Sequence, residues 1–215
     1  NGLLSTVAYK IGEEKPVYAL EGSVAVAGSL VQWARDSLNL VESAQQLDRE
    51  ALTVADSGGV YIVPAFSGLF APYWRSDARG VIAGLTAFVT KAHLCRAILE
   101  STAFQAYDIF KAMESDSGIA TTELKVDGGM TNSEPLMEFQ ADLLGVPVIR
   151  PRVVETTALG AAYAAGLSVG VYRDLDELSS HWKERKRWES TMDEETRSEK
   201  VRFWKKAVER TLEWV

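Results

Sequence analysis

The stretch Leu124-Lys125-Val126-Asp127-Gly128-Gly129-Met130-Thr131-Asn132 decides how this chain is expected to fold. Three residues of strand character run into a pair of adjacent glycines, and the pattern then predicts a helix. Asn132 or Ser133 is placed to cap that helix, Pro135 falls in its first turn, and Gly145 follows its end. A strand that turns through glycines into a helix indicates an α/β domain.

Strand and helix patterns also alternate on both sides of this stretch. Short strands are predicted over 60–63, 81–86 and 146–149. Apolar residues at helical spacing predict a long helix over 91–115, and a run of alanines and glycines predicts another over 157–169. Small side chains in the second helix would allow a neighbouring element to approach closely.

The two ends of the chain complete this layout. Alternating apolar residues predict a hairpin over 7–20, which favours a mixed β-sheet flanked by helices. A helix is expected over 22–36, and a loop with a short helix over 39–57. The last 23 residues, 193–215, are expected to form an amphipathic helix, and the basic run 183–187 to form the solvated face of a helix.

Composition excludes several classes of function. The chain has 215 residues and a formal net charge of −7, which disfavours binding to the phosphate backbone of nucleic acids. No apolar run approaches the roughly 18 residues of a membrane span. One cysteine, Cys95, and two histidines cannot build a zinc site of ordinary spacing. The start of the chain does not resemble a signal peptide and is expected to lie within a longer protein.

The glycine pair is the best candidate for a binding site. Glycines without side chains let a flat ring or a phosphate lie against the backbone, and the N-terminus of the following helix suits an anion or a ribose oxygen. Ligands also tend to sit beyond the ends of strands in open α/β sheets. On the residues alone, a tight connection without a ligand is the more frequent role of such a turn.

Longer motifs add a resemblance to a known family. The run 124–131 resembles the adenosine motif of the actin-like ATPase superfamily. Gly80-Val81-Ile82-Ala83-Gly84-Leu85, followed after seven residues by His93-Leu94-Cys95-Arg96-Ala97-Ile98-Leu99-Glu100, resembles the C-terminal signature of the FGGY carbohydrate kinases. Runs at 1–8, 18–24, 63–69, 71–74 and 155–162 are similar to those members of the family that phosphorylate glycerol.

This resemblance implies an actin-like (ribonuclease H-like) ATPase fold in which residues 1–215 form a single domain, the C-terminal ATP-binding lobe. The complete enzyme would transfer the γ-phosphate of ATP to glycerol with the help of Mg²⁺. The catalytic base and most glycerol contacts would come from an N-terminal lobe that this chain lacks. No residue here is therefore expected to be catalytic, and the fragment alone is expected to be inactive. A cytoplasmic location and a homodimer or tetramer would fit the family.

The nucleotide contacts of the family carry over residue by residue. Its helix motif of a glycine and a glutamine matches Gly28 and Gln32, and the alanine of its adenine pocket matches Ala44. The glycine pair matches Gly128 and Gly129. The family usually has asparagine four residues after the second glycine, where this chain has Ser133, with Asn132 one place earlier. Either the turn shifts by one residue or a hydroxyl replaces the amide.

Other interpretations remain open at this stage. The chain could belong to a kinase of another polyol or sugar, to a non-catalytic relative, or to an interaction domain that uses its aromatic C-terminal helix. Among single residues, His93 is expected to be structural, Cys95 a buried thiol, and Tyr73 with Trp74 anchors of a loop. Asp127 could approach a metal through water or could hold the turn through its own backbone.

Overall fold

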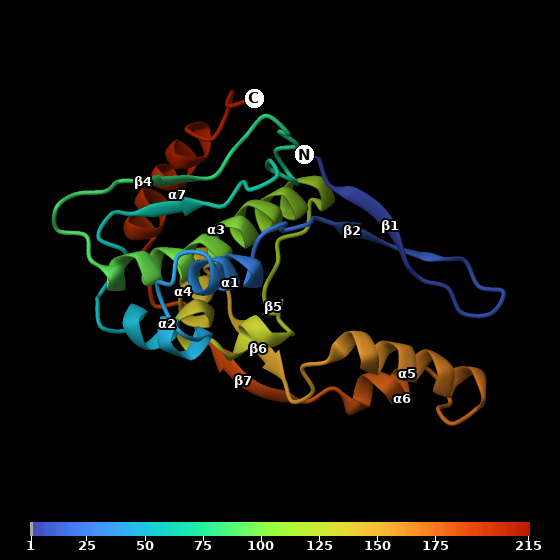
Figure 1. The fold of residues 1–215 in the computed structure, drawn as a ribbon. Helices are drawn as coiled ribbons and strands as arrows, with labels where there is room; N and C mark the ends of the chain where they lie inside the picture. Colours follow the sequence, from blue (N-terminus) through green and yellow to red (C-terminus); the bar gives the residue numbers. More distant parts are fainter. Residues whose placement is uncertain (1) are drawn as a thin grey trace.

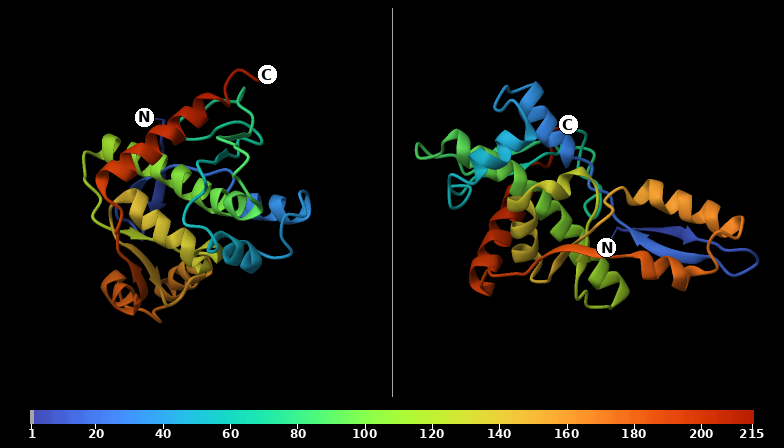
Figure 2. Two further views of the ribbon diagram at one scale, coloured as in Figure 1. Left: turned by 90° about the vertical axis from the view of Figure 1, so that its left-hand side faces the viewer. Right: turned by 90° about the horizontal axis from the view of Figure 1, so that it is seen from below.

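The structure, a computed structural model, describes residues 2–215 and has a helical body with a projecting arm (Figure 1). The body surrounds helix α3 (Lys91–Ser117). The arm consists of the hairpin β1 (Leu4–Tyr9) and β2 (Val17–Glu21), which lies alongside helices α5 (Thr156–Ser168) and α6 (Leu175–His181), as seen from below in Figure 2. The predicted hairpin is thus confirmed.

The strands form small sheets. Strands β3 (Tyr61–Val63) and β4 (Val81–Ala83) pair antiparallel. Strand β5 (Leu124–Lys125) runs parallel to β6 (Val148–Pro151), and β6 pairs antiparallel with β7 (Glu184–Trp188). The predicted mixed pairing is confirmed in the β5-β6-β7 sheet, while the other strands form two separate two-stranded sheets in the described chain.

Helix α3 is the centre of the hydrophobic core. Its Phe104 stacks on Trp204 of α7 (Glu194–Glu209) with ring centroids 5.0 Å apart and meets Phe139 of α4 (Glu134–Leu144) edge-on at 5.5 Å. Helices α1 (Gly28–Asp36) and α2 (Ala44–Ala51) also contact it. Burying aromatic rings in this way is the main source of stability for such a core. At the start of α3, the Thr90 amide donates to His93 Nδ1 over 3.1 Å, so the structural role expected for His93 is confirmed.

The helix expected over 22–36 begins only at Gly28, so its predicted start is wrong. Tertiary contacts hold the preceding segment, residues 22–27, in an irregular, bent conformation. Gln105 Nε2 donates a 2.9 Å hydrogen bond to the carbonyl of Val26. This carbonyl therefore accepts from a side chain and not from a backbone amide of a helix. Gly22 packs so tightly that a Cβ there would lie 2.6 Å from Ile109 Cγ2. Tertiary packing therefore overrides the helical spacing of 22–27.

The C-terminal helix ends at Glu209 instead of continuing to 215. The residues beyond it turn back onto the loop before β4. Arg79 donates its amide to the Thr211 carbonyl over 2.9 Å, and the Glu213 amide donates to Asp77 over 2.9 Å. These bonds satisfy backbone groups that a longer helix would have used.

Residues 184–187 of the basic run 183–187 lie in strand β7 and not on a helix, so that expectation is wrong. As the edge strand of its sheet, β7 carries charged side chains, a common feature of sheet edges. Its last residue, Trp188, is buried and donates from Nε1 to Glu134 over 2.9 Å. Helix α6 was not expected either; the Asp174 side chain caps it by accepting from the Glu177 amide over 2.9 Å.

Helix α5 has the predicted small residues, but no element covers most of it in the described structure. Only Gly166 of this helix is buried, against Tyr172. No helix of residues 2–215 is long and apolar enough to cross a bilayer.

Candidate nucleotide site

Three segments converge on the turn that follows β5. The 3-10 turn η1 (Gly129–Asn132) lies against the start of α1, where a Cβ on Gly28 would sit 3.7 Å from Met130 Sδ. The start of α4 joins α2 through a 2.7 Å hydrogen bond from Ser133 Oγ to Asp48 Oδ1. The sequence motifs at Gly28 and at Gly128-Gly129, about a hundred residues apart, are thus neighbours in space.

The two glycines have different roles in this turn. Gly128 has φ of +81° and donates its amide to the Val154 carbonyl over 3.0 Å, so it needs the backbone freedom of glycine. Thr131 closes the turn, because its hydroxyl donates 2.7 Å to the Gly128 carbonyl. Gly129 is exposed, and a Cβ there would meet no atom within 4 Å. The backbone at Gly129 is therefore open to a flat ligand.

A buried arginine holds the far end of the turn, and sequence reasoning missed it. Arg150 lies on β6 and donates from Nη1 to the Thr131 carbonyl over 2.6 Å and to Asn132 Oδ1 over 3.4 Å. Its guanidinium carbon lies 5.4 Å from the ring centre of Trp188. Its Nε is buried without a hydrogen-bond partner among residues 2–215. The signal available in the sequence was a lone charged residue inside an otherwise apolar strand, at 148–151.

The structure separates the two residues considered for the amide position. Ser133 is buried, and its hydroxyl is committed to Asp48. Burial, with a further contribution from the charge of Glu134, raises the pKa of Asp48 above its ordinary value, although the Ser133 bond opposes this. Asn132 is exposed at the end of the turn, and its Oδ1 faces Arg150. Of the two side chains, only that of Asn132 is accessible from solvent.

The remaining predicted contacts lie nearby on exposed helix positions. Gln32 is one turn after Gly28 and shares its face of α1. Ala44 is the first residue of α2, after Ser43, whose hydroxyl caps the helix by accepting from the Gln46 amide over 3.1 Å. Both residues are exposed, and no contact joins them to the glycine turn in the described chain.

The two acids beside the turn, Glu134 and Asp127, differ in their surroundings. Glu134 accepts hydrogen bonds from Trp188 and Lys186. Burial acts to raise the pKa of Glu134, but these two donors together with the charges of Lys186 and Arg150 hold it below the ordinary value. Asp127 is exposed. Within residues 2–215, no group of three or more histidines, cysteines or acids is placed to hold a metal ion.

Other residues considered in the sequence have structural roles. Tyr73 is an anchor, as expected, because its hydroxyl donates 2.7 Å to the buried Asp108. Trp74 donates from Nε1 to the Gly2 carbonyl. Glu100 is buried and accepts a 2.9 Å bond from Arg96. Cys95 is a fully buried free thiol.

Comparison with known proteins identifies the family. The model of the FGGY family of carbohydrate kinases, C-terminal domain, matches residues 1–169. A glycerol kinase of Pseudarthrobacter chlorophenolicus is 62% identical over the whole chain, which spans 43% of that relative. A glycerol kinase of Plasmodium falciparum solved with ADP superposes with a TM-score of 0.88 at 41% identity, over 98% of this chain and 42% of that one.

A xylulose kinase of Lactobacillus acidophilus has the same fold. It superposes with a TM-score of 0.72 at 24% identity, over 93% of this chain and 40% of that one. The actin-like α/β fold class expected from the sequence is therefore confirmed. The chain belongs to the FGGY family of carbohydrate kinases and corresponds to the C-terminal domain of that family.

Proposed function

We propose that this chain is the ATP-binding lobe of a glycerol kinase, which transfers the γ-phosphate of ATP to glycerol and releases ADP. The choice of glycerol is supported by the 62% identity, over every residue of the chain, to a protein named glycerol kinase. Because the chain spans less than half of that relative, we assign the catalytic base and most glycerol contacts to a second lobe of the same polypeptide. Residues 1–215 act as one domain and contribute no catalytic residue.

The observation that carries the nucleotide assignment is the open backbone at Gly129 beside the start of α1. Gly28 at the start of α1 lies next to Met130 of the turn, so the two segments form adjacent walls. An adenine or ribose ring rests on Gly128 and Gly129 in this proposal, and Asn132 supplies the amide that the family places one residue later. Such kinases act mainly by positioning the phosphates and offsetting their charge.

Gln32 and Ala44 mark the outer limits of the same site. Both are exposed on the helices that border the turn, where they could contact a bound nucleotide without any change of backbone. Ser133, by contrast, supports the site from inside through Asp48. We therefore propose that the side chain of Asn132, and not that of Ser133, contacts the nucleotide.

Mg²⁺ would offset phosphate charge in the complete enzyme. We assign no residue of this chain as its ligand, because the acids near the turn are paired or isolated. We also propose a cytoplasmic location, in keeping with the single unpaired thiol Cys95, and a homodimer or tetramer as an assembly to be tested by sedimentation.

The decisive experiment uses the complete protein that contains this chain. ADP release is followed with Mg-ATP and glycerol, xylulose, ribulose, gluconate or no acceptor. Strong stimulation by glycerol alone is the expected result. Stimulation by a sugar instead would overturn the acceptor, and absence of both stimulation and ATP binding would assign the protein to the non-catalytic class.

A second measurement tests the division of labour between the lobes. ADP binding and glycerol phosphorylation are compared between residues 1–215 and the complete protein. The proposal expects no turnover by residues 1–215 alone, because the base lies elsewhere. Phosphorylation of glycerol by the isolated chain would contradict this assignment.

A further inference from the structure

A cavity of about 730 Å³ lies in the body of the molecule, between β3, α3, the end of α4 and α7 (Figure 1). Its lining shares no residue with the glycine turn or with the helices that border that turn on the nucleotide side. A volume of this size is in the range of pockets that hold small organic molecules. The rings and charges of the lining decide which class of molecule it suits.

Aromatic rings form much of the wall of this cavity. Tyr61 of β3 and Phe203 of α7 stack with their ring centroids 6.1 Å apart. Phe88 is 71% exposed beside the cavity, and its ring centroid lies 5.0 Å from that of His93. Phe139 of α4 adds a fourth ring. Because ring faces attract cations as well as apolar groups, these walls suit a ligand that combines an apolar stem with positive charge.

A buried carboxylate also lines the cavity. Glu100 of α3 is 3% exposed and accepts a 2.9 Å hydrogen bond from Arg96 Nε. Burial raises the pKa of Glu100 above its ordinary value, although the charges of Lys200 and Arg96 and the hydroxyl of Ser57 act in the opposite direction. The charged form of Glu100 would therefore gain from one more positive charge nearby, and an anion would disfavour it further.

Tyr61 lies in a negative electrostatic field. Burial raises the pKa of its hydroxyl, and the charges of Glu100, Glu199 and Asp56 raise it further, while Arg202 opposes them. Acids also outnumber bases in the whole lining, which has a formal charge of −2. These residues are Asp56, Glu100, Asp142 and Glu199 against Arg96 and Lys200. The cavity as a whole therefore favours a cation.

Internal hydrogen bonds hold the rim of the cavity in place without a ligand. The Gly58 amide donates to Asp56 Oδ1 over 2.7 Å, and a Cβ on Gly58 would lie only 2.8 Å from His93 Cδ2. This turn is thus packed against the start of α3. On the other side, Asp142 Oδ1 accepts from the Thr191 amide over 2.6 Å and so fixes the loop before α7. A ligand can bind to such a rim without first ordering it.

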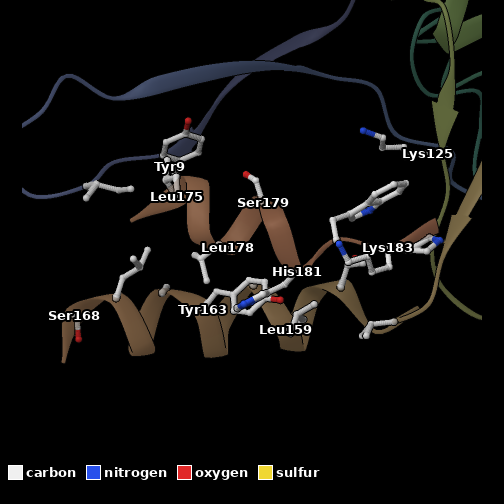
Figure 3. Close-up of a pocket in the computed structure, with 18 of the residues that line it drawn as sticks. Tyr9, Lys125, Leu159, Tyr163, Ser168, Leu175, Leu178, Ser179, His181 and Lys183 are labelled. Atoms are coloured by element: carbon white, nitrogen blue, oxygen red, sulfur yellow. The ribbon is translucent and has the colours of Figure 1, made fainter. Parts of the chain in front are cut away.

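A cavity of opposite charge lies in the arm, between the hairpin, α5 and α6. It has a volume of about 840 Å³, and its lining in the described chain contains lysine and arginine but no aspartate or glutamate. Figure 3 shows Lys125 and Lys183 beside it. Because these charges repel a cation, the two cavities differ in the sign of the ligand that they accept.

We propose that the cavity between β3, α3, α4 and α7 binds a small organic cation, with an ammonium group on an apolar stem. The ammonium group lies near the carboxylates of Glu100 and Glu199, which offset the cost of removing its charge from water. The stem packs against the rings of Phe88 and Phe203. This site adds to the proposed function and does not depend on it, since its lining is separate from the nucleotide site.

Three matched probes test the sign of the charge. Phenethylammonium, its neutral counterpart phenethyl alcohol and the anion hydrocinnamate are each titrated into the complete protein by calorimetry. The ammonium is expected to bind at least about tenfold more tightly than the alcohol, and the anion more weakly than either. Failure of the ammonium to bind, or equal binding of all three, would overturn the proposal. Tightest binding of the anion, on Arg96 and Lys200, would overturn it too.

Substitutions in the complete protein locate the bound ammonium. Glu100→Gln keeps the shape of the side chain and should weaken ammonium binding by about tenfold or more, with little effect on the alcohol. Because Glu100 is buried, Glu199→Gln and Phe88→Ala provide readouts at exposed positions, and each should weaken binding by about threefold. Glu195→Gln, exposed on α7 outside the cavity, is the matched control. If all these variants bind like Glu195→Gln, the ammonium does not occupy this cavity.

The titration is repeated with saturating ADP to separate this site from the nucleotide site. The affinity for phenethylammonium is expected to be unchanged within about twofold, because the two linings share no residue. Displacement of the ammonium by ADP would place it at the glycine turn and overturn the proposal. Selective ammonium binding by a protein that does not phosphorylate glycerol would overturn only the proposed activity.

Discussion

The hydroxyl of Ser133 donates a 2.7 Å hydrogen bond to Asp48 and so ties the start of α4 to α2 across 85 residues of sequence. Ser133 is 7% exposed, and burial raises the pKa of its partner. The residue at the position where the family pattern has asparagine thus stabilises the site from within. The exposed amide beside the glycine turn is that of Asn132.

Ser133→Ala is therefore expected to affect stability more than binding. The change leaves Asp48 without its neutral donor, which should lower the free energy of unfolding by about 1–2 kcal/mol. ADP affinity, measured by calorimetry, should change less than about twofold, because the hydroxyl is not accessible to ligand. Ser198→Ala, at an exposed position on α7, serves as the control for urea unfolding. A large loss of ADP affinity at unchanged stability would contradict this role for Ser133.

The glycine pair offers a matched test of ligand approach. Gly129→Ala should leave the unfolding free energy nearly unchanged, because the added methyl group meets no atom within 4 Å. It should weaken ADP binding by about tenfold or more, since it occupies the space proposed for the nucleotide. Gly128→Ala should instead cost about 1–3 kcal/mol of stability, because φ of +81° strains any other residue. If Gly129→Ala binds ADP normally, the nucleotide does not lie on this backbone.

Sequence reasoning located the glycine turn, the long helix α3 and the hairpin because each has a strong local signal. The spacing of apolar residues and the positions of glycines predict such elements without any knowledge of tertiary contacts. The start of α1 was misplaced because Gln105, 79 residues away, holds the Val26 carbonyl. The expectation of a helix over the basic run was wrong because nearly every residue there is charged. Such a run shows neither the two-residue period of a strand nor the 3.6-residue period of a helix.

The candidate site was predicted less completely than the fold. Gly28 and Gly129 could be found because their motifs are local, and the structure brings their segments together. Arg150 was missed because its role depends on a 2.6 Å hydrogen bond to the carbonyl of Thr131, 19 residues earlier. The spacing of residues in the sequence does not predict such a contact. The commitment of Ser133 to Asp48 is equally non-local, so the sequence left both amide positions open.

Arg150 should behave as a positioning residue for the turn. Arg150→Met removes the donor to the Thr131 carbonyl and releases Asn132, which should raise the Kd for ADP by about tenfold. Arg150→Lys, which keeps the charge, should recover part of this loss. Arg49→Met, at an exposed position on α2, is the control. Unchanged ADP affinity in a destabilised Arg150→Met protein would show that the arginine only supports the sheet.

The buried thiol of Cys95 should make the free energy of unfolding depend on pH in the alkaline range. Burial raises the pKa of this thiol to about 11, with a smaller contribution from the charge of Glu50. Because the pKa is higher in the folded protein than in the unfolded chain, the associated stability is present below about pH 9 and is lost as pH rises through 11. Cys95→Ala should therefore show a smaller loss of unfolding free energy between pH 8 and 11, by about 2 kcal/mol. Urea titrations of both proteins at the two pH values measure the difference. Equal losses would mean that the thiol does not ionise on unfolding.

The most sensitive polar position in the core should be Asp108. Asp108 is 4% exposed, and its carboxylate accepts from Trp204 Nε1 and from the Tyr73 hydroxyl, each over 2.7 Å, with Lys205 as its ionic partner. Asp108→Ala leaves the buried Trp204 Nε1 and the Tyr73 hydroxyl without the carboxylate that accepts from them, and it removes the ion-pair partner of Lys205, so it should cost about 3–5 kcal/mol. Urea unfolding followed by tryptophan fluorescence measures this, because Trp204 lies in the network.

Two further variants separate charge from hydrogen bonding at this position. Asp108→Asn keeps an acceptor for Trp204 but loses the attraction to Lys205, so its cost should fall between that of Asp108→Ala and zero. Asp36→Ala, which removes an exposed ion pair with Arg35, should leave the free energy of unfolding nearly unchanged. If Asp108→Ala costs no more than Asp36→Ala, the anchoring of the Tyr73 loop comes from apolar packing and not from this carboxylate.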